Sequence, residues 1–141
     1  MRRPSGETVP GVRKIAVLRA NAVGDFILTL PALDALRRAY PEAEIVLLGL
    51  PWHADFLRDR PGPVDRVVEV PAYPGLRDGG LADGATVPFF ARMQEERFDL
   101  AIQLHGGGRH SNPFVRRLGA RLTLGSRTPD APPLDRWIPY R

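Results

Sequence analysis

Short apolar runs alternate with helix-like segments along this chain of 141 residues, and this alternation limits the fold more than any other feature. The runs are continuous rather than alternating in polarity, and each is bounded by polar residues, Gly or Pro. Continuous apolar runs are typical of strands that are buried on both faces, and such strands occur in parallel sheets. Strands that alternate with helices form βαβ units. We therefore predict an α/β fold, a Rossmann-like parallel sheet with helices on both faces.

The pattern also predicts where the elements lie. Strands are expected over 15–18, 44–48, 66–70, 100–104 and 122–124. Helices are expected over 26–40, 52–59, 87–97 and 114–118. Pro31 lacks a backbone donor, so a kink or a restart is expected within the first helix. The third strand is less apolar than the others, which indicates an edge position, and the Gly- and Pro-rich segment 71–86 predicts a long surface loop.

The two ends of the chain differ from its middle. Residues 1–13 are polar and carry no apolar stretch long enough for a signal peptide, so a flexible tail is expected there. Residues 14–127 form the predicted domain. Residues 128–141 contain four Pro and no periodicity, which indicates a linker toward a C-terminal domain that this sequence does not contain.

Arginine supplies nearly all of the positive charge, because Lys14 is the only lysine and the formal net charge is +4. A basic chain suits an anionic partner such as a phosphorylated glycolipid, a membrane surface or nucleic acid. The arginines are scattered, however, so a genome rich in G and C explains them equally well. There is no Cys, and the three His lack metal-ligand spacing, so neither a disulfide nor a metal site is expected. The three His, His53 among them, are expected on the surface, and Trp52 and Phe56 are expected to be packing residues.

The turn after the first strand carries the candidate chemistry. It contains Arg19, Asn21, Gly24 and Asp25, and a helix opens there. Ligands of open α/β sheets bind outside the carboxyl ends of the strands. A helix N-terminus also stabilises a carboxylate, so Asp25 is expected at the rim of a ligand crevice. Gly24 permits a tight turn and a close approach to substrate. The residues alone leave two roles open for Asp25, a helix cap or a catalytic carboxylate.

A glycine-rich segment, His105-Gly106-Gly107-Gly108, follows the fourth strand and is expected to face the same crevice. Its backbone amides suit phosphate or hydroxyl groups of a ligand, and a plain flexible turn is the alternative. The segment resembles the oxyanion loop of lipases, but no Ser lies in the Gly-x-Ser-x-Gly setting that those hydrolases need.

Neither a dinucleotide fingerprint nor a phosphate loop is present, which argues against a dehydrogenase or an NTPase. Arg19 is expected either to bind an anion or to pair with a carboxylate.

Three segments occur together in a characteristic order. The first, 14–41, joins a buried strand, a turn ending in Gly-Asp, and a helix containing Leu-Pro-Ala-Leu. The second is Phe-Asp-Leu-Ala-Ile-Gln-Leu-His-Gly at 98–106, and the third is Leu-Gly-Ala-Arg at 118–121, followed by Gly125. This ordered set, over residues 14–127, resembles glycosyltransferase family 9, the ADP-heptose:lipopolysaccharide heptosyltransferase group.

The resemblance implies a GT-B architecture, in which two Rossmann-like domains face a cleft and residues 14–127 are the N-terminal, acceptor-binding domain. It implies inverting transfer of a sugar, heptose in this group, from a nucleotide-sugar donor to a lipopolysaccharide-core or similar glycan acceptor, without a metal or other cofactor. The donor, ADP-heptose, would be bound mainly by the absent C-terminal domain, so this chain alone is expected to be inactive. Asp25 would be the catalytic base; the expected substrate-binding residues are Arg19, Asn21, Gly24, His105, Gly106 and Gly107.

The turn departs from the pattern of the group, since many members have Ser or Thr where this chain has Asn21 and Ala22. The identity of the acceptor therefore stays undetermined. The expected partner is a glycolipid or glycan acceptor and not nucleic acid, on the cytoplasmic side of a bacterial inner membrane. Arg side chains would allow peripheral contact with anionic lipid there. The competing interpretation is a stand-alone, non-catalytic Rossmann-like module that binds a ligand.

Overall fold

The computed structural model describes residues 9–20, 23–58, 62–77 and 84–140, and within 23–28 it describes only the backbone. The strands are β1 (Lys14–Leu18), β2 (Glu44–Gly49), β3 (Arg66–Glu69), β4 (Leu100–Gln103), β5 (Leu122–Arg127) and β6 (Arg136–Pro139). The helices are α1 (Val23–Ala39), α2 (Pro51–Leu57), α3 (Thr86–Glu96) and α4 (Ser111–Arg116).

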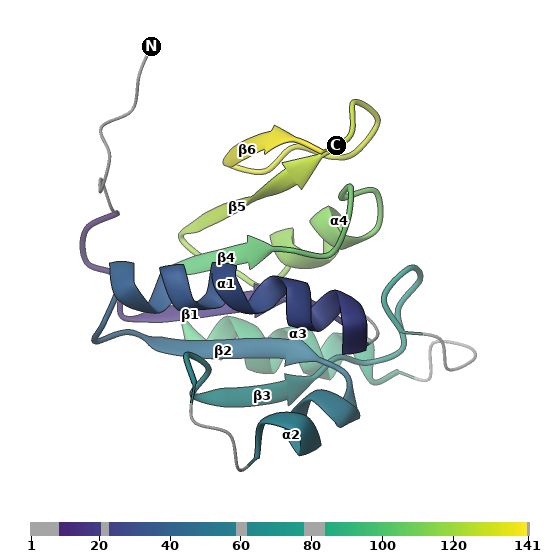
Figure 1. Ribbon diagram of the computed structural model, residues 1–141. Helices are drawn as coiled ribbons and strands as arrows, with labels where there is room; N and C mark the ends of the chain where they lie inside the picture. The colour runs from purple at the N-terminus through teal and green to yellow at the C-terminus, as the bar shows by residue number, and fades with distance from the viewer. Residues whose placement is uncertain (1–8, 21–22, 59–61, 78–83, 141) are drawn as a thin grey trace.

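The strands form one six-stranded sheet in the order β3-β2-β1-β4-β5-β6. Every neighbouring pair is parallel, and the arrows in Figure 1 accordingly point the same way. The predicted Rossmann-like α/β class is therefore confirmed. The expected edge position of the third strand is also confirmed, because β3 ends the sheet.

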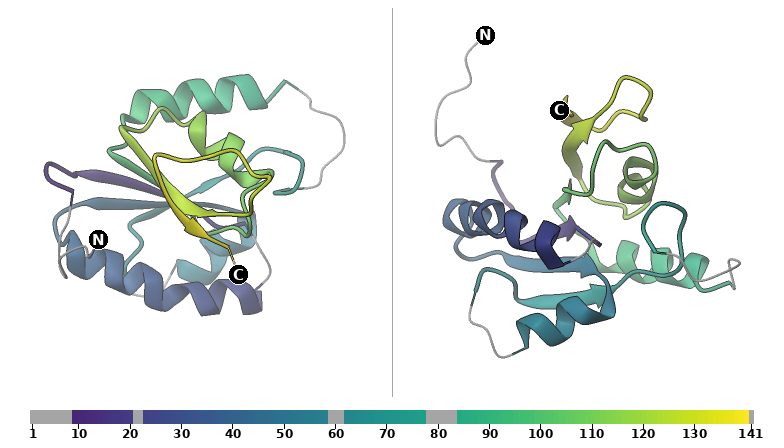
Figure 2. Two further views of the ribbon diagram at one scale, coloured as in Figure 1. Left: turned by 90° about the horizontal axis from the view of Figure 1, so that it is seen from above. Right: turned by 45° about the vertical axis from the view of Figure 1, so that its right-hand side comes forward.

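Helices cover both faces of the sheet. Figure 2 shows α1 on one side and α3 on the other. Side chains of β1 alternate between the two faces: Ile15 and Val17 pack in the cluster that includes Leu33 of α1, whereas Ala16 and Leu18 pack in the cluster that includes the aromatic residues of α3 and α4. All four β1 side chains are fully or almost fully buried. This two-sided burial explains why the strand is a continuous apolar run.

Two local predictions differ from the structure. The first helix was expected to kink or restart at Pro31, but α1 is one uninterrupted helix through that residue. Pro31 lies on its exposed side, while Leu33 packs against the sheet. The segment 128–141 was expected to be an irregular linker, but it contains β6, which pairs with β5. All four β6 residues are exposed, so no buried run marks the strand in the sequence.

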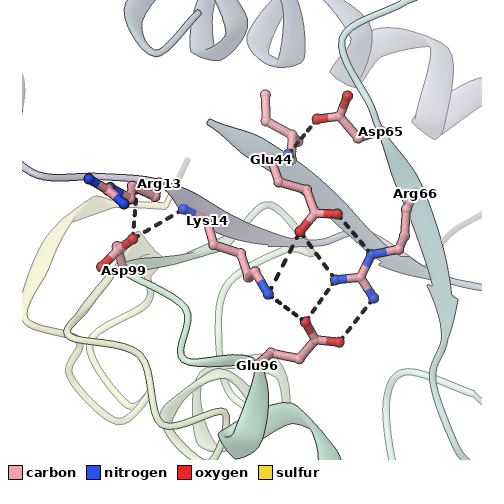
Figure 3. Close-up of polar contacts among 8 residues, drawn as sticks. Arg13, Lys14, Glu44, Asp65, Arg66, Glu96 and Asp99 are labelled. Atoms are coloured by element: carbon pink, nitrogen blue, oxygen red, sulfur yellow. Dashed lines mark hydrogen bonds and ion pairs between the residues drawn. The ribbon is translucent and has the colours of Figure 1, made fainter. Parts of the chain in front are cut away.

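A network of ion pairs lies where the amino ends of β1, β2 and β3 meet the end of α3 (Figure 3). Arg66 binds Glu96 through two parallel hydrogen bonds of 2.8 and 2.9 Å. Lys14 contacts the same carboxylate at 2.9 Å, and Glu44 contacts both cations. The bonds from Arg66 and Lys14 lower the pKa of Glu96 to about 2, against the opposing effect of its partial burial. The network therefore ties three strands and a helix together at the amino ends of the strands.

We expect Glu96→Gln to lower the free energy of unfolding by about 1–2 kcal/mol at pH 7, because the amide keeps the shape but loses both charged partners. The folded pKa of Glu96 lies below its ordinary value of 4.5. Its contribution is therefore fully present above about pH 4.5 and is lost as the pH falls toward about 2. Urea unfolding at pH 7 and pH 3 should show the gap between wild type and variant narrowing at the lower pH.

The matched control is Asp55→Asn, which breaks the exposed pair between Asp55 and Arg58 on the surface of α2. Exposed pairs contribute little, so a loss below about 0.5 kcal/mol is expected for it. Equal losses in the two variants, or a gap for Glu96→Gln that does not depend on pH, would contradict the assigned role of Glu96.

Candidate functional site at the carboxyl edge of the sheet

The carboxyl ends of the central strands reach the same edge of the sheet. In the register, Leu18 of β1 lies opposite Gln103 of β4, and Gln103 lies opposite Gly125 of β5. The residues that follow these strands are therefore neighbours in space, as expected for a parallel sheet. The segments after β3 and β4 lie beside the arrowheads in Figure 1. Of the predicted site residues that the structure describes, Arg19 follows β1 at this edge, and His105, Gly106 and Gly107 follow β4.

A cleft of about 840 Å³ opens at this edge and runs along β5 and β6 as far as Val9, Pro10 and Tyr40, which precede β1 and β2. Arg19, Gln103, Gly106 and Ser126 line its inner end. The other lining residues include the exposed aromatic side chains of Trp137 and Tyr140 and the aliphatic side chains of Leu104, Leu124 and Ile138. Within the described part of the chain, the charged side chains that line the cleft are the cations Arg19 and Arg136. The cleft therefore suits a ligand that carries anionic or oxygen-rich groups beside an apolar or ring surface.

Arg19 is held in place by the sheet. Its backbone N–H donates to the carbonyl of Leu48 at 3.1 Å, which extends the pairing of β1 with β2. Its guanidinium group donates to the carbonyl of Leu104, the residue after β4. Of the two expected roles, binding an anion or pairing with a carboxylate, neither is tested by these contacts. A guanidinium fixed at the inner end of a cleft has the geometry to contact an anionic group there.

The ring of His105 connects three segments of the edge. Its Nδ1 accepts a hydrogen bond of 3.2 Å from the backbone N–H of Ala20, just after β1. Its Nε2 lies 3.0 Å from the carbonyl of Gly75, in the segment after β3. This pattern assigns the neutral tautomer with the hydrogen on Nε2, because Nδ1 must accept and the carbonyl can only accept. His105 therefore links the turn that precedes α1 to both neighbouring loops.

The glycine segment is fixed through its carbonyl groups. The carbonyl of His105 accepts from Ser111 Oγ at 3.1 Å, and the carbonyl of Gly106 accepts from Ser126 Oγ at 3.0 Å. The carbonyl of Gly107 accepts from the backbone N–H of Thr128 at 2.8 Å. Gly106 has a φ of 79°, a backbone conformation that glycine adopts without strain. The segment is thus a bonded loop, and the two serines serve as its donors.

A second histidine, His53, is buried beside the end of β2. His53 was expected on the surface, but it is fully buried in α2, where its Nδ1 accepts a 2.8 Å bond from the N–H of Leu50. Trp52 stacks on its ring with centroids 3.8 Å apart and meets Phe56 edge-on, so both aromatic residues serve in packing, as expected. Burial is the main cause that lowers the pKa of His53 to about 4. His53 is therefore a neutral structural residue at neutral pH.

The predicted site residues are brought together only in part. Arg19 and Gly106 line the cleft, whereas His105 and Gly107 line an adjoining pocket of about 350 Å³. Asn21 lies outside the described residues. Gly24 and Asp25 are the second and third residues of α1, at the same edge of the sheet, but their side-chain surroundings lie outside what the structure describes. The role of Asp25 stays a prediction.

Several polar residues of the site were missed in the sequence. Gln103 and Asn112 are buried within the loop system behind the glycine segment. A signal for Gln103 was present, since it interrupts an otherwise apolar strand. Trp137 and Tyr140 were not predicted as site residues, because β6 itself was not predicted.

The described residues contain neither a cluster of metal ligands nor a membrane-spanning helix. Nowhere in the described ranges do three His, Asp or Glu side chains come together in a way that would hold a metal ion. Among the helices that the structure describes, none has the length and apolar character needed to span a bilayer.

Comparison with solved structures finds a similar fold in the crystal structure of a glycosyl transferase family 9 protein from Veillonella parvula. The TM-score is 0.63 and the sequence identity is 19%. The match covers 89% of this chain but 36% of that protein, so this chain spans about a third of its length. No family model matches the sequence, and no curated protein matches it. The likeness is one of fold.

The burial of His53 leads to a prediction of pH dependence. Its folded pKa of about 4 lies below the ordinary value of 6.5, so the unfolded chain binds the proton more tightly. Stability is therefore full above about pH 6.5 and falls as the pH drops toward 4. Between pH 7 and pH 5 the wild type is expected to lose about 1–2 kcal/mol of unfolding free energy through this residue.

The comparison variant is His53→Asn, whose side-chain oxygen can replace Nδ1 as acceptor but does not titrate. Urea unfolding at pH 7, 6 and 5 should give a shallower pH dependence for the variant than for the wild type. His110→Asn is the control, because His110 is exposed. If His53→Asn leaves the pH dependence of the unfolding free energy unchanged, another group causes that dependence.

Proposed function

We propose that this chain is the N-terminal, acceptor-binding domain of an inverting glycosyltransferase. In this proposal, heptose is transferred from ADP-heptose to a lipopolysaccharide-core or similar glycan acceptor. In this proposal, the donor-binding half lies outside these 141 residues. The match covers only 36% of the protein of similar fold, which is correspondingly longer. The acceptor is held at the cytoplasmic face of a membrane, with peripheral contact through arginine side chains.

The observation that carries the proposal is the cleft at the carboxyl edge of the sheet. Arg19 and Gly106 of the glycine loop both line this cleft, and Trp137 and Tyr140 supply aromatic surfaces. Guanidinium groups bind phosphates, and aromatic rings pack on sugar rings, so this lining matches a phosphorylated glycan. The fold likeness to a glycosyl transferase adds support, although fold alone does not determine function.

The role of base comes to Asp25 from the resemblance to glycosyltransferase family 9, and the position of Asp25 in the first turn of α1 supports it. Inverting transfer needs a carboxylate within hydrogen-bond reach of the attacking hydroxyl group. That hydroxyl must also lie in line with the anomeric carbon, opposite the leaving diphosphate. The positive end of α1 favours the ionised carboxylate, so Asp25 takes the proton late, as the new C–O bond forms. Arg19 and the glycine loop hold the acceptor in this position.

The test uses the complete polypeptide that the gene encodes, with ADP-heptose and a heptose-deficient lipopolysaccharide core as substrates. Asp25→Asn is expected to lower kcat by at least about 100-fold, which is the usual contribution of a positioned base, and to leave the KM for the acceptor within about threefold. The matched control is Asp34→Asn, because Asp34 is an exposed carboxylate on the same helix. It should retain wild-type rates.

Turnover of Asp25→Asn within a factor of about three of the wild type would reject the assignment of the base. Binding of the core glycan without transfer by the complete polypeptide would support the competing interpretation, a non-catalytic ligand-binding module.

A further inference from the structure

We propose that Gln103 and Asn112 form a buried amide pair that positions the loop 105–108, so that successive backbone N–H groups of this loop face the acceptor. The ligand groups that the loop would take are the oxygen atoms of phosphate or hydroxyl groups. This inference rests on the proposed function, since it concerns how the same cleft holds its acceptor. Gln103 is a positioning residue here, because it acts through the loop.

The amide of Gln103 bonds to the loop in two directions. Its Oε1 accepts from the backbone N–H of His105. Its Nε2 lies 3.2 Å from the carbonyl of Gly106, 3.1 Å from the carbonyl of Ser126 and 3.1 Å from Asn112 Oδ1. One side chain therefore fixes both ends of the His105–Gly106 step and ties it to β5. Gln103 is only 1% exposed.

Asn112 completes the arrangement from α4. Its Oδ1 accepts from Gln103, and its Nδ2 donates to the carbonyl of Pro132 at 2.9 Å. Asn112 is fully buried. Buried amides are costly unless they are hydrogen-bonded, and neighbouring positions on this face of β1 and β4 carry apolar residues. The pair therefore replaces apolar packing with a set of directed bonds that connect α4, the loop and the segment before β6.

Two glycines make room for the amides. A Cβ atom at Gly108 would lie 2.3 Å from Asn112 Nδ2, and Gly108 also has a φ of 95°. A Cβ atom at Gly125, on the neighbouring strand, would lie 2.8 Å from the Cβ of Gln103. A larger residue would therefore collide with the amide of Asn112 at position 108 and with the Cβ of Gln103 at position 125. This fit is independent of the hydrogen bonds and supports the same pair.

The direction of the loop N–H groups follows from peptide geometry. In a trans peptide the carbonyl of one residue and the N–H of the next point in opposite directions. No peptide bond described in the structure is cis. The carbonyls of His105, Gly106 and Gly107 all accept bonds from the protein body. The N–H groups of Gly106, Gly107 and Gly108 are therefore directed away from those partners.

These three successive N–H groups are available as hydrogen-bond donors. Within the described part of the chain, no hydrogen bond starts from any of them. Gly106 lines the cleft, and Gly107 and Gly108 line the adjoining pocket. Successive backbone N–H groups in such a loop bind anionic or hydroxyl oxygen atoms. Arg19 at the inner end of the cleft adds the positive charge that a phosphate group needs.

The first experiment measures amide hydrogen exchange by NMR in this chain. Gln103→Met removes every bond of the amide, so the His105 N–H should exchange at least about tenfold faster, and the Gly106–Gly108 resonances should shift. Gln103→Glu keeps an acceptor for His105, so its N–H should stay protected while Gly106 shifts. Thr123→Val is the matched control, because Thr123 is a buried polar residue of β5 that bonds to Asp135 and not to the loop.

The second experiment measures kinetics in the complete polypeptide, with ADP-heptose and the heptose-deficient core. Gln103→Met is expected to raise the KM for the core about tenfold, with kcat and the KM for ADP-heptose within about threefold of wild type. A variant that is merely less well folded would instead lose kcat at unchanged KM. A larger effect on a phosphorylated core than on its dephosphorylated form would identify phosphate as the bound group, and equal effects would identify hydroxyl groups.

If Gln103→Met does not fold, Ser126→Ala replaces it, since it removes one donor to the Gly106 carbonyl. It should shift the same glycine resonances to a smaller extent. The inference is overturned if these resonances do not move, or if kcat falls while the KM for the core stays unchanged. Absence of transfer by the wild type would refute the proposed function, whereas the exchange measurements would still decide whether the amide pair positions the loop.

Discussion

The structure depends on the parallel register that places β1 between β2 and β4. Leu18 lies opposite Leu48 on one side and Gln103 on the other, so the three strands end together. Because both faces of these strands are buried under helices, the register cannot slip without exposing the core. The residues at the amino ends of the strands can therefore differ in role from those at the carboxyl ends. The ion pairs around Glu96 tie down the amino edge, and the loops of the carboxyl edge supply Arg19, Leu104 and Gly106 to the lining of the cleft.

The carboxyl edge is built from polar groups with strict geometric requirements. His105 connects the segments that follow β1 and β3, and Gln103 connects its own loop to β5 and α4. The amides of Gln103 and Asn112 are buried, and an unpaired polar group is costly in such surroundings. These bonds fix the loop after β4 to β5 and α4. Holding an acceptor hydroxyl near a base demands such fixed positions, because small displacements cost much of the rate.

The sequence was sufficient to predict the sheet, since runs such as that of β1 are apolar throughout only when both faces are covered. It also predicted the edge at which Arg19, His105 and the glycines meet, because parallel strands end together. It did not predict β6, whose exposed residues are held by pairing with β5 and by the bonds between Thr123 and Asp135. Nor did it predict the amide pair, because a bond between Gln103 and Asn112 depends on how α4 packs, which periodicity does not reveal.

The central claim is that the carboxyl edge of this sheet binds a glycan acceptor. The most direct measurement titrates the isotope-labelled chain with a phosphorylated, heptose-deficient lipopolysaccharide core oligosaccharide and follows the backbone amide signals. The account predicts that the perturbed signals cluster at Arg19, Ala20 and Gly106–Gly108, and that those of Lys14, Glu44 and Arg66 at the opposite edge do not move. Perturbation confined to the opposite edge, or no perturbation at saturating oligosaccharide, would contradict it.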